Sequence, residues 1–105
     1  MGVVSVYCVF ADEAEARRIG RTVVEEGFAA CINILAPCRS IYRWDGKIEE
    51  AVEVPAILKT SEAAAEQLIA RVAELHSYDV PAITVWPARH ALPAYAKWVE
   101  QGSRG

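Results

Sequence analysis

The sequence lacks a block of basic charge, a long apolar run and a paired set of cysteines. Its 105 residues carry a formal net charge of −3, and its eleven lysines and arginines are scattered. Electrostatics therefore favours neither nucleic acid nor an anionic membrane as a partner. No apolar run approaches the ~20 residues that cross a bilayer. Three cysteines without a Cys-x-x-Cys pair indicate a reducing cytoplasm rather than a disulfide framework.

Motifs of common catalytic sites are also missing. The sequence contains no G-x-S-x-G turn, no glycine-rich phosphate loop and no H-E-x-x-H helix. The carboxylates at 12–15 are explained by the start of a helix, where the macrodipole favours negative charge. Asp12 is the predicted N-cap, and Glu15 stands three residues later, as in a capping box. We therefore expect a protein that is not an enzyme.

The residues that are present predict one domain over 1–105, because an apolar content of 53% fills a single core. Hydrophobic patterning predicts strands at 3–10, 28–35, 47–59 and 80–86. Helices are predicted to begin near Asp12, Ser61 and Pro93. This order, βαββαβ with a short last helix, is typical of a two-layer α+β sandwich of the ferredoxin-like kind, with the first and third strands at its centre.

The most informative stretch, residues 38–54, predicts a hairpin. Asp45-Gly46 is the strongest short-range signal for a type I′ turn, because both central positions of that turn need a positive φ. The turn pairs Trp44 with Lys47 and fixes the register of the two strands. The hairpin then reaches well beyond the sheet as an arm, with about seven residues a side spanning roughly 24 Å.

Two prolines set the base of this arm. Pro37 and Pro55 fall at nearly the same level of the two strands, and each lacks the N–H that a ladder needs. We expect both strands to break there. A ribbon of two strands is marginal in water and its edges invite pairing, so we expect the arm to dock on another copy of the chain.

Aromatic and charged side chains on the arm are the predicted contacts between copies. Tyr42 and Trp44 have the makeup of interface anchors, and the alternative is cross-strand pairing that only stiffens the ribbon. We favour the interface, because an isolated arm has too little body to bury a tryptophan. Glutamates of the returning strand are expected on a solvated or inter-chain ion-paired face. The predicted interface residues are Arg39, Tyr42, Arg43, Trp44, Glu49 and Glu53.

A cysteine and a histidine are the candidate metal ligands. Cys8 lies mid-strand between apolar neighbours, where a buried and inert thiol is the simplest interpretation. His76 lies near the end of the second predicted helix, where a capping role is ordinary. Together they could offer a thiolate and an imidazole to a soft metal such as copper.

These residues, taken in order, resemble the CutA family of divalent-cation tolerance proteins from residue 4 to residue 98. The resemblance implies a ferredoxin-like subunit in a compact homotrimer whose hairpins pack against neighbouring subunits. It also implies a role in tolerance of copper or another divalent cation. The segments that carry it are Ala30-Cys31-Ile32-Asn33, residues 40–49 (SIYRWDGKIE), Glu53, Leu58-Lys59-Thr60, residues 76–81 (HSYDVP) and residues 95–98 (YAKW).

In the family, a cysteine of the first strand and two consecutive histidines are the proposed copper ligands. Cys8 and His76 match the cysteine and the second histidine, and Leu75 stands in place of the first. The subunit plan is also similar to that of trimeric PII signalling proteins, which bind small molecules between subunits. An alternative function is therefore a small-molecule sensor, motivated by Lys59 and Glu53 among aromatic residues and by clefts between subunits.

Overall fold

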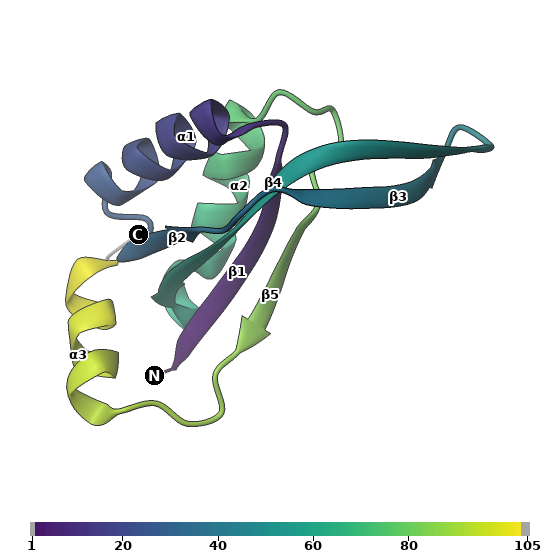
Figure 1. The fold of residues 1–105 in the computed structure, drawn as a ribbon. Helices are drawn as coiled ribbons and strands as arrows, with labels where there is room; N and C mark the ends of the chain where they lie inside the picture. Colours follow the sequence, from purple (N-terminus) through teal and green to yellow (C-terminus); the bar gives the residue numbers. More distant parts are fainter. Residues whose placement is uncertain (1, 104–105) are drawn as a thin grey trace.

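Five antiparallel strands form one sheet with two helices packed on it (Figure 1). The computed structural model describes residues 2–103, and strands β1 and β4 are central in the order β2-β4-β1-β5, with β3 paired to β4. This α+β arrangement confirms the predicted fold class. The elements are β1 (Val3–Phe10), α1 (Glu13–Glu25), β2 (Cys31–Ile34), β3 (Cys38–Trp44), β4 (Lys47–Ser61), the 3-10 helix η1 (Glu62–Ala64), α2 (Ala65–Leu75), β5 (Ile83–Pro87) and α3 (Pro93–Gly102).

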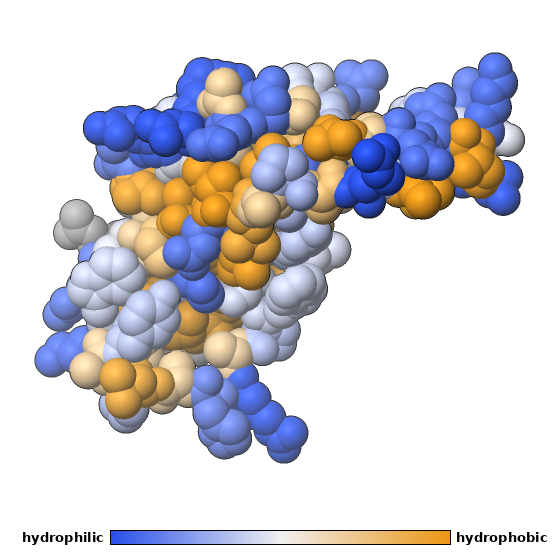
Figure 2. All heavy atoms as spheres, viewed as in Figure 1, coloured by the Kyte–Doolittle hydropathy of each residue, from blue (hydrophilic) through white to orange (hydrophobic). Residues whose placement is uncertain are grey.

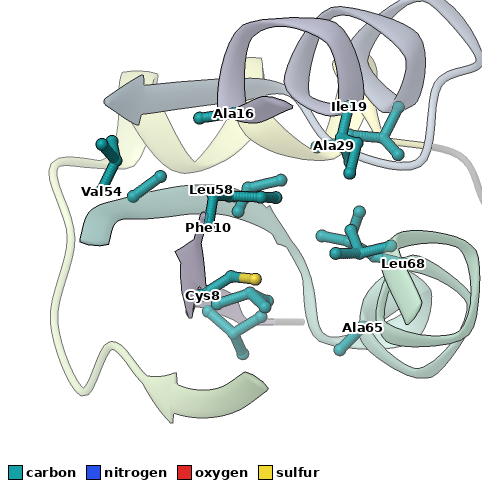
Figure 3. Packing of buried hydrophobic residues seen from close by; sticks show 14 residues of the cluster. Cys8, Phe10, Ala16, Ile19, Ala29, Val54, Leu58, Ala65 and Leu68 are labelled. Carbon is teal, nitrogen blue, oxygen red and sulfur yellow. The ribbon is translucent and has the colours of Figure 1, made fainter. Parts of the chain in front are cut away.

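The core lies between the sheet and the helices α1 and α2. Alternate residues of β1 turn their side chains to this side, and Cys8 and Phe10 are fully buried there beside Leu58 of β4 (Figure 3). Ile19 of α1 and Leu68 of α2 close the cluster from the helical layer. The helices bury these positions because their apolar residues recur at helical spacing.

The arm is the part of the sheet that extends away from this core (Figure 1). Its register confirms the predicted one: Trp44 faces Lys47, and Cys38 faces Glu53. The turn has φ values of 54° at Asp45 and 81° at Gly46, as a type I′ turn requires. The turn sequence therefore sets which side chains share each face of the arm.

The prediction that both strands break at the prolines is half right. Pro37 separates β2 from β3, but β4 runs unbroken through Pro55. Ile34 faces Ala56 and Cys38 faces Glu53, so three residues on one side oppose two on the other, as in a bulge. The Pro55 carbonyl accepts the Leu35 N–H at 2.9 Å. The N–H and C=O groups of one strand residue point toward the same neighbouring strand. The Pro55 carbonyl points toward Leu35, so the position of its missing N–H also faces the bulge. No regular ladder bond is needed there.

Two predicted strands are shorter than expected. The strand predicted at 28–35 begins at Cys31, because the Phe28 N–H is bonded to the Val23 carbonyl at the end of α1. The strand predicted at 80–86 begins at Ile83. The residues at 80–82 belong to a loop whose Ala82 carbonyl accepts the Val9 N–H of β1 at 3.3 Å.

Candidate functional site

Cys8 is held as a buried thiol. Its side chain is inaccessible to solvent, and the Sγ atom makes only a weak 3.8 Å contact with the Val9 carbonyl. Burial, and secondarily the charge of Glu15, raises the pKa of Cys8 to about 12. A thiol binds metal as the thiolate, so this environment opposes the ligating form.

His76 is the C-cap of α2, as predicted. Both nitrogens of its ring have hydrogen-bond partners. The Tyr78 N–H donates to Nδ1 at 3.0 Å, so Nδ1 carries no proton. Nε2 lies 2.8 Å from the Val9 carbonyl, which can only accept, so Nε2 is the protonated nitrogen. The ring also stacks on Phe10 with centroids 5.2 Å apart. His76 therefore fastens the loop after α2 to β1.

These two residues do not fit a resident cation in this conformation. Both nitrogens of His76 already have partners, and the thiol of Cys8 is protonated at neutral pH. Within residues 2–103, no group of three or more His, Cys, Asp or Glu side chains is placed to hold a metal ion. The assignment of Cys8 and His76 as metal ligands stays a prediction that this geometry does not support.

Glu15 is a third buried polar group beside them. Its Oε1 accepts the Ala11 N–H at 2.9 Å and its Oε2 accepts the Ser77 N–H at 2.8 Å, while its own N–H donates to Asp12. In an ordinary capping box the Glu15 carboxylate would accept the N–H of the N-cap, Asp12. Here it accepts the N–H of the preceding residue, Ala11. Burial alone would raise the pKa of Glu15, but these hydrogen bonds outweigh it and hold the pKa below its ordinary value.

The predicted interface residues of the arm divide between two faces. Arg39 and Arg43 share one face with three exposed aliphatic residues, and we call it the aliphatic face. Figure 2 shows apolar surface beside hydrophilic surface on the arm. The aliphatic residues were not predicted as contacts, although their alternation along the strands was a signal. They are Ile41, Ile48 and Val52, which are 65%, 60% and 58% exposed.

The other face of the arm, which we call the acidic face, is turned toward the loop at 78–82. Tyr42, Trp44, Glu49 and Glu53 lie on it. Between this face and the loop at 78–82 is a pocket of about 480 Å³. Its lining residues are Val9, Ser40, Tyr42, Trp44, Glu49, Glu53, Tyr78, Asp79, Val80 and Ala82.

Glu53 is a lining residue at the base of the arm, where it faces Cys38. It is 9% exposed, and its Oε2 accepts the Tyr78 hydroxyl at 2.7 Å. Burial and this hydrogen bond raise the pKa of Tyr78 above its ordinary value, because ionising the phenol would place a second negative charge beside the carboxylate. In the single chain Glu53 therefore holds the arm to the body, and its role between chains stays a prediction.

Lys59 and the aromatic residues Trp86 and Tyr95 lie apart from this pocket. Trp86 stacks on Tyr7 at 5.2 Å on the face of the sheet opposite the core, and it is 50% exposed. Lys59 donates to Asn33 at 3.3 Å, and Tyr95 of α3 contacts Cys31 at 3.8 Å. Of the two charged residues that motivated a small-molecule site, Glu53 lines the pocket and Lys59 does not.

Comparisons with known proteins give one consistent result. The family model described as CutA1 divalent ion tolerance protein matches residues 4–102. The divalent-cation tolerance protein CutA of Pyrococcus horikoshii is 43% identical over 97 residues, covering 92% of this chain and 94% of that protein. Mouse protein CutA is 39% identical over 90 residues, and this chain spans about half of its length, 51%.

Solved structures agree. The divalent cation tolerance protein of Thermus thermophilus superposes with a TM-score of 0.92 at 36% identity, covering 96% of this chain and 98% of that one. A protein of Archaeoglobus fulgidus, described as a periplasmic divalent cation tolerance protein CutA, superposes with a TM-score of 0.92 at 32% identity, covering 95% and 97%.

Proposed function

Because this chain belongs to the CutA1 divalent ion tolerance family, we propose that it acts in divalent-cation tolerance as a cytoplasmic homotrimer that catalyses no reaction. In this proposal the trimer binds copper or another divalent cation. The match of the family model across nearly the whole chain is the observation that carries the proposal.

Exposed apolar surface supports self-association. Ile41, Ile48 and Val52 give the aliphatic face of the arm three neighbouring apolar side chains that the single chain leaves largely in water. Trp86 adds a half-exposed tryptophan on the open side of the sheet. Exposed apolar side chains grouped on one face of a small protein are typical of an interaction site. Burial against a second and third copy would remove it from water.

The cytoplasmic location rests on the three free cysteines. Among residues 2–103, no helix is long and apolar enough to cross a membrane. Fractionation of the producing cell, with marker proteins for each compartment, tests the location directly.

Cation binding is tested by titrating copper into the purified, metal-free protein and measuring heat. We expect saturable binding by the wild type. The geometry of Cys8 and His76 predicts that a Cys8→Ala, His76→Ala double variant binds to the same extent, provided that its circular dichroism shows it folded. A Cys38→Ala, His90→Ala variant removes the same residue types elsewhere and serves as the matched control.

Two results of the copper titration would contradict parts of this proposal. Absence of saturable binding by the wild type contradicts direct cation binding. Binding lost only in the Cys8, His76 variant assigns the cation to that pair, and His76 must then release Val9 or Tyr78.

The pocket at the acidic face favours a second candidate function, the sensing of a small molecule.

A further inference from the structure

We infer that the pocket at the acidic face binds an elongated organic polycation, of the linear polyamine class. This inference rests on the second candidate function and identifies its ligand class. Three carboxylates and three aromatic rings line the pocket, and among the described residues no lysine or arginine does. They are Glu49, Glu53, Asp79, Tyr42, Trp44 and Tyr78.

The carboxylates of the pocket have no cationic partner within residues 2–103. Salt bridges elsewhere pair glutamates with arginines, and Glu50 on the opposite face of the arm lies 3.9 Å from Arg39. Lys47 faces Trp44 at the arm tip but forms no salt bridge with Glu49 in the described part of the chain. Glu53 is 9% exposed, whereas Glu49 and Asp79 are exposed to solvent, so the low-dielectric attraction for a cation is strongest at Glu53.

The spacing of the carboxylates favours an organic cation over a metal ion. Glu49 and Glu53 are four residues apart on β4, so they are separated by about 14 Å along the strand. A single Mg²⁺ or Ca²⁺ needs its oxygens within about 2–2.6 Å, and one ion cannot meet both carboxylates. A chain with positive charges at both ends can meet both.

The surface between the two carboxylates suits the hydrocarbon part of such a ligand. Ser40 and Ala51 face each other there, and their small side chains leave space. Tyr42 lies directly opposite Glu49. Methylene groups pack on an aromatic ring, and an ammonium near the ring gains a cation–π attraction. The volume of about 480 Å³ is that of a small-molecule site.

The test is calorimetric titration of spermidine into the purified full chain, in its native oligomeric state, at low salt with a chelator present. We expect saturable binding that weakens as salt rises. Glu49→Gln and Glu53→Gln are each expected to weaken it roughly five- to tenfold. Putrescine, a shorter diamine that cannot span the two carboxylates, is expected to bind more weakly. The chelator removes free divalent cations, so spermidine binding is measured independently of the cation binding that the copper titration tests.

Glu50→Gln is the matched control, because it removes the same charge from the same strand on the opposite face. Its spermidine binding should equal that of the wild type. Equal losses in Glu49→Gln and Glu50→Gln would mean general attraction of a polycation to an acidic protein, and would overturn the inference. So would the absence of saturable binding. A Glu49→Gln variant that loses oligomeric mass would show that a basic side chain of a second copy occupies the pocket, which also overturns it.

Discussion

Single residues fasten distant parts of this chain in ways that the sequence indicates only in part. The caps at Asp12 and Ser61 and the burial of Cys8 follow from local pattern, and the structure confirms them. The second partner of Glu15, the Ser77 N–H, lies 62 residues away. A contact of that separation depends on the packing of α1 against the loop after α2, so no local pattern could reveal it.

Glu15 gives a prediction for stability against pH. Its pKa is lowered in the folded chain, so its contribution is fully present above the unfolded value of about 4.5 and is lost as the pH falls through the folded value. Glu15→Gln keeps one acceptor oxygen and loses the other. We expect it to lower the free energy of unfolding at pH 7 by about 1–3 kcal/mol.

The measurement is urea unfolding of wild type and Glu15→Gln at fixed protein concentration, at pH 7 and at about pH 3.5. The difference between them should shrink at the acid pH. Glu13→Gln, at an exposed position of the same helical turn, should show little loss at either pH. An equal loss for Glu15→Gln at both pH values would contradict a role for its charge.

At the scale of elements, the arm is the feature that local sequence predicts best. Asp45-Gly46 set the turn and the register correctly, because turn geometry depends on two residues. The effect of Pro55 was predicted wrongly, because a proline interrupts a strand only where its N–H is needed. The one-residue bulge opposite it removes that need. The pocket was not predicted, since it requires the arm to meet the loop at 78–82.

The aliphatic face of the arm gives a prediction for assembly. The test variant carries two substitutions, Ile41→Thr and Ile48→Thr. Both keep a β-branched residue on the strand. Both remove apolar surface that the single chain leaves exposed. We expect the intrinsic stability of the subunit to change little. Association should weaken by about 1–2 kcal/mol for each residue buried between copies.

Sedimentation velocity across a dilution series measures this change. Glu66→Gln, at an exposed position of α2 away from the arm, is the control and should sediment as the wild type does. If the double threonine variant keeps the wild-type mass at every concentration, the aliphatic face is not part of the contact.

For the whole molecule, the order of helices and strands along the chain predicts the fold. It does not predict the surface through which copies of the chain assemble. Tyr7 and Trp86 are 79 positions apart, and only the pairing of β1 with β5 brings their rings together. The assembly number has no local signature either. The marginal stability of an isolated two-stranded arm predicts self-association, and the threefold arrangement comes from the resemblance to the family.

The proposed function depends on a trimer, and light scattering on the full chain at micromolar concentration measures whether that trimer forms. The predicted result is a single folded species with three times the 11.5 kDa mass of the chain. A folded species with the mass of one chain would contradict it.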